Sequence, residues 1–127
     1  MTANKLRAAV LVVGLMPVLS GCQHSLPEPV DPDRAREALR TTLSAWQNGD
    51  SADALRDRSA ITAADPKWQD GHRLVRYEIA DQDQVVGCDL HCRVLLVLTR
   101  PDGRQIQEQV VYCVSTSGAL VVVRADG

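Results

Sequence analysis

The stretch LHCRVLLVLTRPDGRQIQEQVVYCV, residues 90–114, decides the fold. Two apolar-rich runs flank Arg100-Pro101-Asp102-Gly103, a sequence typical of a type I turn followed by a left-handed glycine. A three-residue loop of this kind sets Arg100 opposite Arg104 and predicts an antiparallel hairpin. The register then places apolar residues opposite one another, at Leu98 and Ile106, Val94 and Val110, Cys92 and Tyr112, and Leu90 and Val114. Only Glu108, opposite Leu96, interrupts the apolar face.

Two further strands are expected from the same period of two. Val75, Tyr77 and Ile79 alternate with Arg76 and Glu78, which indicates a strand with one solvated face. Residues 119–123 form a short apolar run near the C-terminal end. We therefore expect an antiparallel sheet of about four strands.

Helices are predicted ahead of these strands. Asp31 can cap a helix, Pro32 suits its first position, and Asn48-Gly49 is a typical end. A second, shorter helix is expected from Asp50 to about Arg58. The apolar residues of the first helix recur at helical spacing, at Ala35, Leu39, Leu43 and Trp46.

One short pattern occurs twice. Residues 65–71 (DPKWQDG) predict a single capped helical turn, and Trp68-Gln69-Asp70-Gly71 echoes Trp46-Gln47-Asn48-Gly49. So short a match does not make a repeat. We interpret both as turns that end at a glycine and press a tryptophan onto the core.

Helices first and antiparallel strands after predict an α+β fold with the long helix across a curved sheet. This outline resembles small nuclear-transport-factor-like and cystatin-like domains. The line from Trp68-Gln69-Asp70-Gly71 through Tyr77-Glu78-Ile79 to the last strands resembles small uncharacterised bacterial lipoproteins. The resemblance implies a fold and no activity.

The N-terminal segment has the three parts of a secretory signal. Lys5 and Arg7 precede the apolar run 8–18, and small residues follow at a cleavage point. The run is much shorter than the roughly 20 residues that a membrane-spanning helix needs. We expect it to direct the chain to export and then to be removed.

Leu19-Ser20-Gly21-Cys22 resembles the lipobox of bacterial lipoproteins. The resemblance implies cleavage between Gly21 and Cys22, lipid on the Cys22 thiol, and a protein held in the cell envelope. Gln23 after the cysteine implies the outer membrane, facing the periplasm. The expected organisation is a signal peptide over residues 1–21, a lipidated tether over 22–30, and one α+β domain over 31–127.

The mature chain would carry 12 basic and 16 acidic residues, a net charge of −4. This balance argues against nucleic acid, which requires a concentrated basic patch. The expected partners are the membrane, through the lipid, and an envelope protein.

Three cysteines remain beside Cys22. Cys92 and Cys113 point to opposite faces in the predicted register, and Cys88 would meet Cys113 only through a bulge near Gly87. In a strand, Cys88 and Cys92 lie about 13 Å apart and His91 points the other way, so we expect no metal and no cofactor. Whether any disulfide forms stays open.

No nucleophile elbow, catalytic triad or phosphate-binding loop is present in the sequence. His72, just after the second tryptophan turn, is the best single candidate for a polar group near a pocket mouth. We expect a non-catalytic binding or structural module. The first alternative is an enzyme with a pocket between the long helix and the concave face of the sheet, and the second is a metal or redox role for the leftover cysteines.

Overall fold

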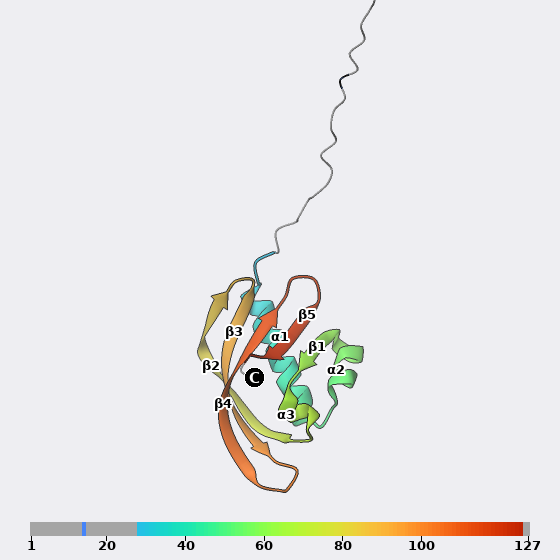
Figure 1. Ribbon diagram of the computed structural model, residues 1–127, viewed down its shortest axis with the longest axis vertical. Helices are drawn as coiled ribbons and strands as arrows, with labels where there is room; N and C mark the ends of the chain where they lie inside the picture. The colour runs from blue at the N-terminus through green and yellow to red at the C-terminus, as the bar shows by residue number, and fades with distance from the viewer. Residues whose placement is uncertain (1–13, 15–27, 126–127) are drawn as a thin grey trace, which may run out of the picture.

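The structure is a computed structural model that describes Gly14 and residues 28–125 (Figure 1). Helices precede most of the sheet, as expected for an α+β protein. The elements in chain order are α1 (Pro32–Gln47), α2 (Ala52–Ser59), β1 (Ile61–Ala64), α3 (Pro66–Gln69), β2 (Arg73–Val86), β3 (Asp89–Thr99), β4 (Gln105–Ser115) and β5 (Leu120–Arg124).

Helix α1 follows the sequence signals closely. The Asp31 side chain accepts a hydrogen bond from the Arg34 backbone N–H, and Pro32 opens the first turn. The helix ends at the Asn48 cap, ahead of Gly49 at φ 88°. The four residues of the predicted apolar stripe are all buried, at Ala35, Leu39, Leu43 and Trp46.

The sheet has five strands in the order β1-β5-β4-β3-β2, and it is mixed. The prediction of about four antiparallel strands was therefore only partly right. Ile61–Ala64 forms a strand that the sequence did not predict, and it pairs parallel to β5 with Ile61 opposite Leu120. Ile-Thr-Ala-Ala has too few large apolar residues and too short a run to show a period of two.

The register of the central hairpin is confirmed. Leu98 lies opposite Ile106, and Cys92 lies opposite Tyr112. The turn closes as predicted, because the Arg100 N–H donates to the Arg104 carbonyl at 2.7 Å. The pairing of Leu96 with Glu108 is also as predicted.

Strand β2 is longer than predicted and bulged. The register shifts between Leu74 and Arg76, and again between Ile79 and Asp83. The first bulge turns Val75 outward, where it is 41% exposed, and buries Leu74 in its place. The expectation that Val75 faces the core was wrong, because an extra residue reverses the alternation of side chains on one side of it.

One hydrophobic core runs from Val30 to Val122. Helix α1 lies across the curved sheet, and its side chains fill the space between them (Figure 1). Leu39 and Leu43 of α1 and Leu90, Leu96 and Leu98 of β3 are among the fully buried side chains. Burying a leucine side chain contributes about 1.5–3 kcal/mol, so this layer supplies much of the stability.

The chain enters the fold at a fixed point. Val30 is buried, and the Asp31 N–H donates to the Thr116 hydroxyl at 2.9 Å. Thr116 lies between β4 and β5 and is itself buried. The predicted signal peptide, Gly21, Cys22 and most of the tether lie outside the described residues. Among the described helices, none is long and apolar enough to cross a membrane.

Candidate functional site

Two matching turns form the base of the candidate site. We call residues 46–50 and 68–72 the paired turns. In the first, Gly49 N–H donates to the Trp46 carbonyl and Asp50 N–H to the Ala45 carbonyl. In the second, Gly71 N–H donates to Trp68 and His72 N–H to Lys67. Both patterns are Schellman motifs, which place glycine in the left-handed region at the end of a helix.

The indole rings join the paired turns. Trp46 Nε1–H donates to the His72 carbonyl at 2.8 Å, and Trp68 Nε1–H donates to the Asp50 carbonyl at 3.1 Å. The rings stack with centroids 5.4 Å apart and planes 14° apart. Each turn is therefore tied to the residue that follows the glycine of the other.

A hollow of about 440 Å³ opens beside the stacked rings. His72 lies in this hollow together with both tryptophans. The imidazole is half-buried, and its Nδ1 atom is buried without a hydrogen-bond partner among the described residues. The other lining residues are Gln47, Gly49, Asp50, Ser51, Gly71 and Arg73.

The one carboxylate that lines this hollow is already engaged. The Asp50 carboxylate accepts a hydrogen bond from Arg58 at 2.9 Å, outside the hollow's lining. Among the described residues, no carboxylate accepts a hydrogen bond from the His72 ring. The arrangement can therefore present an indole edge, an imidazole and an exposed guanidinium to a ligand.

A second polar cluster was missed by sequence reasoning. Asp65, just after β1, accepts hydrogen bonds from the Tyr112 hydroxyl and from Arg124 Nε, the latter at 3.1 Å. Arg124 Nη1 also donates to Glu108 at 3.0 Å. Asp65 is 3% exposed and the Arg124 side chain 7%. The sequence feature that could have indicated this cluster is Glu108, the only charge on the apolar face of the hairpin. A carboxylate on such a face requires a cationic partner.

This buried cluster is tightly packed. The space beside Asp65, Tyr112 and Trp68 is too small for a water molecule. Burial, and then the adjacent Asp65 carboxylate, raise the pKa of Tyr112 above its usual value, so the phenol stays protonated and donates. Asp65 also caps α3 by accepting from the Lys67 N–H at 2.8 Å. The cluster thus ties β1, β4, β5 and α3 together.

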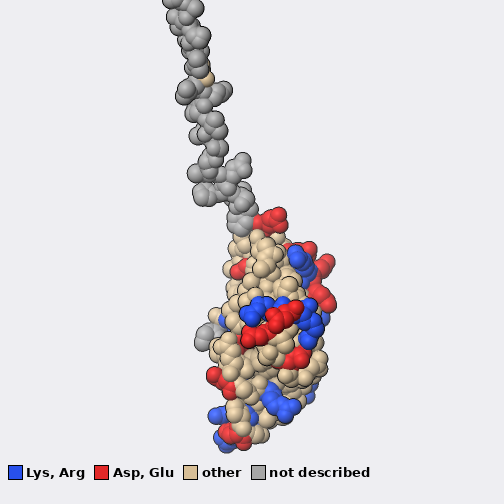
Figure 2. All heavy atoms as spheres, turned by 90° about the vertical axis from the view of Figure 1, so that its right-hand side faces the viewer, with Lys and Arg blue, Asp and Glu red and all other residues tan. Residues whose placement is uncertain are grey.

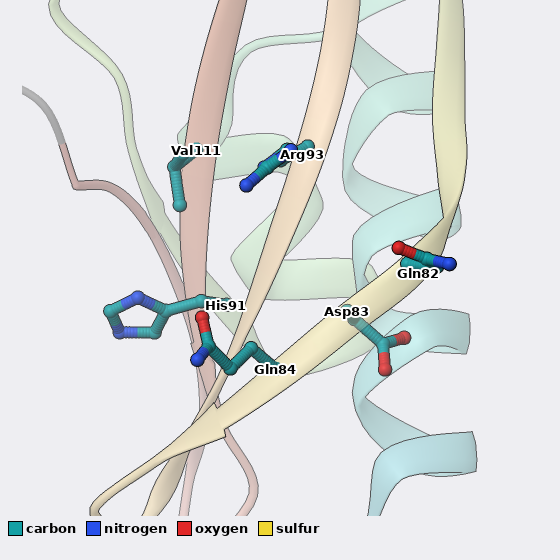
Figure 3. A pocket seen from close by; sticks show the side chains of 6 residues that line it. All are labelled: Gln82, Asp83, Gln84, His91, Arg93 and Val111. Atoms are coloured by element: carbon teal, nitrogen blue, oxygen red, sulfur yellow. The ribbon is translucent and has the colours of Figure 1, made fainter.

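The outer face of the sheet carries another hollow, of about 400 Å³ (Figure 3). His91 points away from α1 on this face, whereas Asp83 points toward the helix. His91 Nε2 lies 3.1 Å from the Sγ atom of Cys113, its cross-strand partner. Cys88, Cys92 and Cys113 are free thiols in the structure, and Cys92 and Cys113 lie on opposite faces as predicted.

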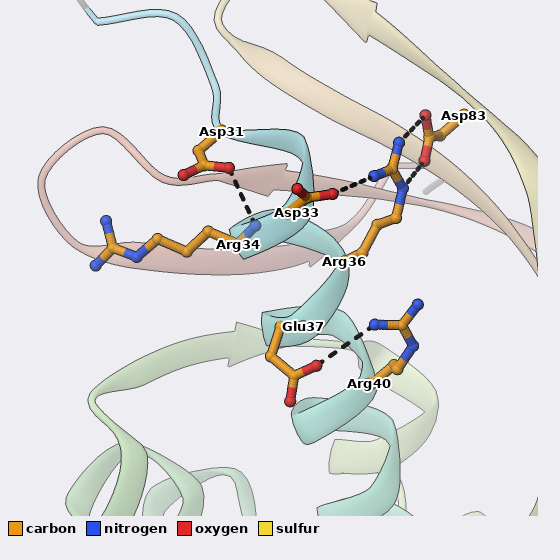
Figure 4. A network of polar contacts seen from close by, with 7 residues as sticks. All are labelled: Asp31, Asp33, Arg34, Arg36, Glu37, Arg40 and Asp83. Atoms are coloured by element: carbon orange, nitrogen blue, oxygen red, sulfur yellow. Dashed lines mark hydrogen bonds and ion pairs between the residues drawn. The ribbon is translucent and has the colours of Figure 1, made fainter.

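Ion pairs cover the exposed side of α1 (Figure 4). Arg36 bridges Asp33 in the helix and Asp83 in β2, and Arg40 pairs with Glu37. Hydrogen bonding to Arg36 lowers the pKa of Asp83 below its usual value, and burial of the carboxylate opposes part of that shift. On the face shown in Figure 2, acidic and basic side chains lie next to one another and form no single-sign patch.

Comparison of the chain with protein-family models, curated proteins and solved structures gives no match in any of the three. The resemblance to nuclear-transport-factor-like and cystatin-like domains therefore stays a prediction.

Proposed function

We propose that the protein is a lipid-anchored lipoprotein of the cell envelope whose folded domain is a non-catalytic binding module. The lipid would be carried by Cys22, and the membrane would be the outer membrane. Support for the anchor comes from the ordered signal that ends in Leu19-Ser20-Gly21-Cys22.

One observation carries the choice of a binding module over an enzyme. The buried Asp65 carboxylate accepts hydrogen bonds from Tyr112 and Arg124, and the space beside Asp65 and Tyr112 admits no water molecule. Such a closed cluster stabilises the fold and cannot meet a substrate. The accessible hollow at the paired turns, in contrast, is built on backbone loops and two indole rings that the fold already uses.

The hollow also has a suitable position. Helix α1 spans about 24 Å at 1.5 Å per residue. The tether enters at its first turn, and the paired turns lie at its last (Figure 1). A partner at the paired turns would therefore bind at the far end of the helix from the tether.

The alternative, an enzyme with a pocket between α1 and the sheet, has one observation in its favour. Arg36, Arg40, Tyr77 and Asp81 line a hollow of about 390 Å³ at the rim between α1 and β2. Deeper between the helix and the sheet, the space is occupied by the apolar core. Turnover of a small substrate that is lost in Arg40→Ala would favour this alternative.

Mass spectrometry of protein extracted from membranes tests the anchor. We expect a chain that begins at Cys22 with added acyl mass. The variant Cys22→Ser should retain the signal and lack the acyl mass. An unmodified Cys22, or a retained signal in the unaltered chain, would contradict the proposal.

Site-specific photo-crosslinking in intact envelopes tests the binding role. A crosslinker at Gln47 or His72 should capture one defined partner, and the same group at Gln107, on the outer face of the sheet, should not. The partner captured at Gln47 should be lost in His72→Ala if the hollow binds it. Capture of the same partner at Gln107 as efficiently as at Gln47 would contradict binding at the paired turns.

A further inference from the structure

Strand β2 is an exposed edge of the sheet. It pairs only with β3, whereas every inner strand has two neighbours. The Val75 carbonyl, at the first bulge, already accepts a hydrogen bond from the Gln47 side chain at 2.9 Å, so the edge available to another chain begins after Val75. An edge strand with free backbone groups is a template for pairing with another chain.

The two bulges of β2 isolate a short regular run, Arg76 to Ile79, which pairs residue by residue with Val97 to Val94. Arg76 and Glu78 lie on the same face of this run, because they are two residues apart. Both are exposed, and neither forms an ion pair within the part of the chain that the structure describes.

These two charges make the edge complementary to itself. If a second copy of β2 ran antiparallel with Tyr77 on a two-fold axis, Arg76 of each copy would lie opposite Glu78 of the other. Opposite charges at directly facing positions stabilise an antiparallel pair, and symmetry would provide the contact twice.

We propose that β2 is a self-association surface through which two copies of this chain form a symmetric, antiparallel pair of edge strands. The interface is small, so the pair is weak and reversible. Helix α1 runs antiparallel to β2, since Gln47 contacts Val75 and Arg36 contacts Asp83. The two tethers therefore lie at opposite ends of the pair. If both lipids enter the same membrane, the paired β2 strands lie parallel to the membrane surface.

Sedimentation velocity of the mature chain carrying Cys22→Ser, over a concentration series, tests this proposal. The unaltered edge should associate at high concentration. Arg76→Glu and Glu78→Arg should each weaken association by about tenfold, because two attractive contacts become repulsive. The double variant R76E/E78R should restore it, and a mixture of the two single variants should form mixed pairs.

Arg34→Glu is the matched control, because it makes the same charge change at an exposed position on α1 and should leave association unchanged. A circular dichroism spectrum and melting curve for each variant establish that it is folded. The proposal is overturned if the chain is monomeric at every concentration, if R34E and R76E act alike, or if the double variant does not associate.

Discussion

Trp46 and Trp68 each donate an indole hydrogen bond to the residue that follows the other's turn glycine, and their rings stack between those bonds. The relationship is reciprocal, so neither turn can move without breaking a contact of the other. Both rings are thereby committed to the structure of the domain.

We expect Trp46→Ala to lower the free energy of unfolding by about 3–5 kcal/mol, the usual cost of truncating a buried tryptophan. Trp68→Ala should cost less, because Trp68 is half-buried. Urea unfolding followed by circular dichroism provides the measurement. The double variant should cost less than the sum of the two single variants, because the stack can be lost only once. A Trp46→Ala protein as stable as the original would show that the ring is not an anchor.

The buried cluster predicts an asymmetric response. Arg124→Leu should destabilise the protein by about 3–5 kcal/mol, because it leaves the Asp65 and Glu108 carboxylates without their cation. Tyr112→Phe removes the hydrogen bond that the Tyr112 hydroxyl donates to Asp65 and should cost about 1–3 kcal/mol. Chemical denaturation of both variants should be compared with Arg104→Leu, an exposed control expected to stay within about 0.5 kcal/mol. Equal stability of R124L and R104L would contradict the assigned role.

Acid should weaken the contact between α1 and β2. The pKa of Asp83 lies below its ordinary value because Arg36 donates to its carboxylate. The resulting stabilisation is complete above the pKa of Asp83 in the unfolded chain, and it is lost as the pH falls through the lower folded value. Asp83→Asn should therefore be less stable than the original protein at neutral pH, and the difference should disappear in acid. Melting curves from about pH 7 to pH 2 measure this, and a difference independent of pH would refute it.

The three cysteines should differ in reactivity. Burial raises the pKa of Cys92 to about 11, so its thiol stays protonated and shielded at neutral pH. Burial and the Asp89 charge also raise the pKa of Cys113. Cys88 lies at the β2–β3 turn and should be alkylated first, with Cys92 modified only after unfolding. Peptide mass spectrometry after timed iodoacetamide treatment gives the order, with Cys88→Ser as the control. Rapid native labelling of Cys92 would contradict the packing.

The hairpin could be predicted to the residue because its turn chemistry and its alternation of apolar side chains agree on one register. Helix α1 was equally predictable, since a cap, a proline and a glycine mark its ends. These signals are local, and each occurs within a few residues of the feature that it determines.

What could not be predicted depends on residues far apart in the chain. Strand β1 is held by β5, about 60 residues later, and its four residues carry no pattern of their own. The bulge at Val75 needs the partner strand to define it. The Asp65–Arg124 contact joins segments that are distant in the sequence. Glu108 on an apolar face indicates that a cation lies nearby, but it does not indicate which one. The likeness of the two tryptophan turns was visible in the sequence, but their exchange of hydrogen bonds was not.

The fixed entry point of the chain has a mechanical consequence. Any tension on residues ahead of Val30 reaches the fold through the Val30 side chain and the bond from Asp31 to Thr116. Thr116 belongs to the link between β4 and β5, so the load passes into the middle of the sheet as well as into α1. Tension on the tether is therefore shared between helix α1 and the sheet. It does not act on the first turn of the helix alone.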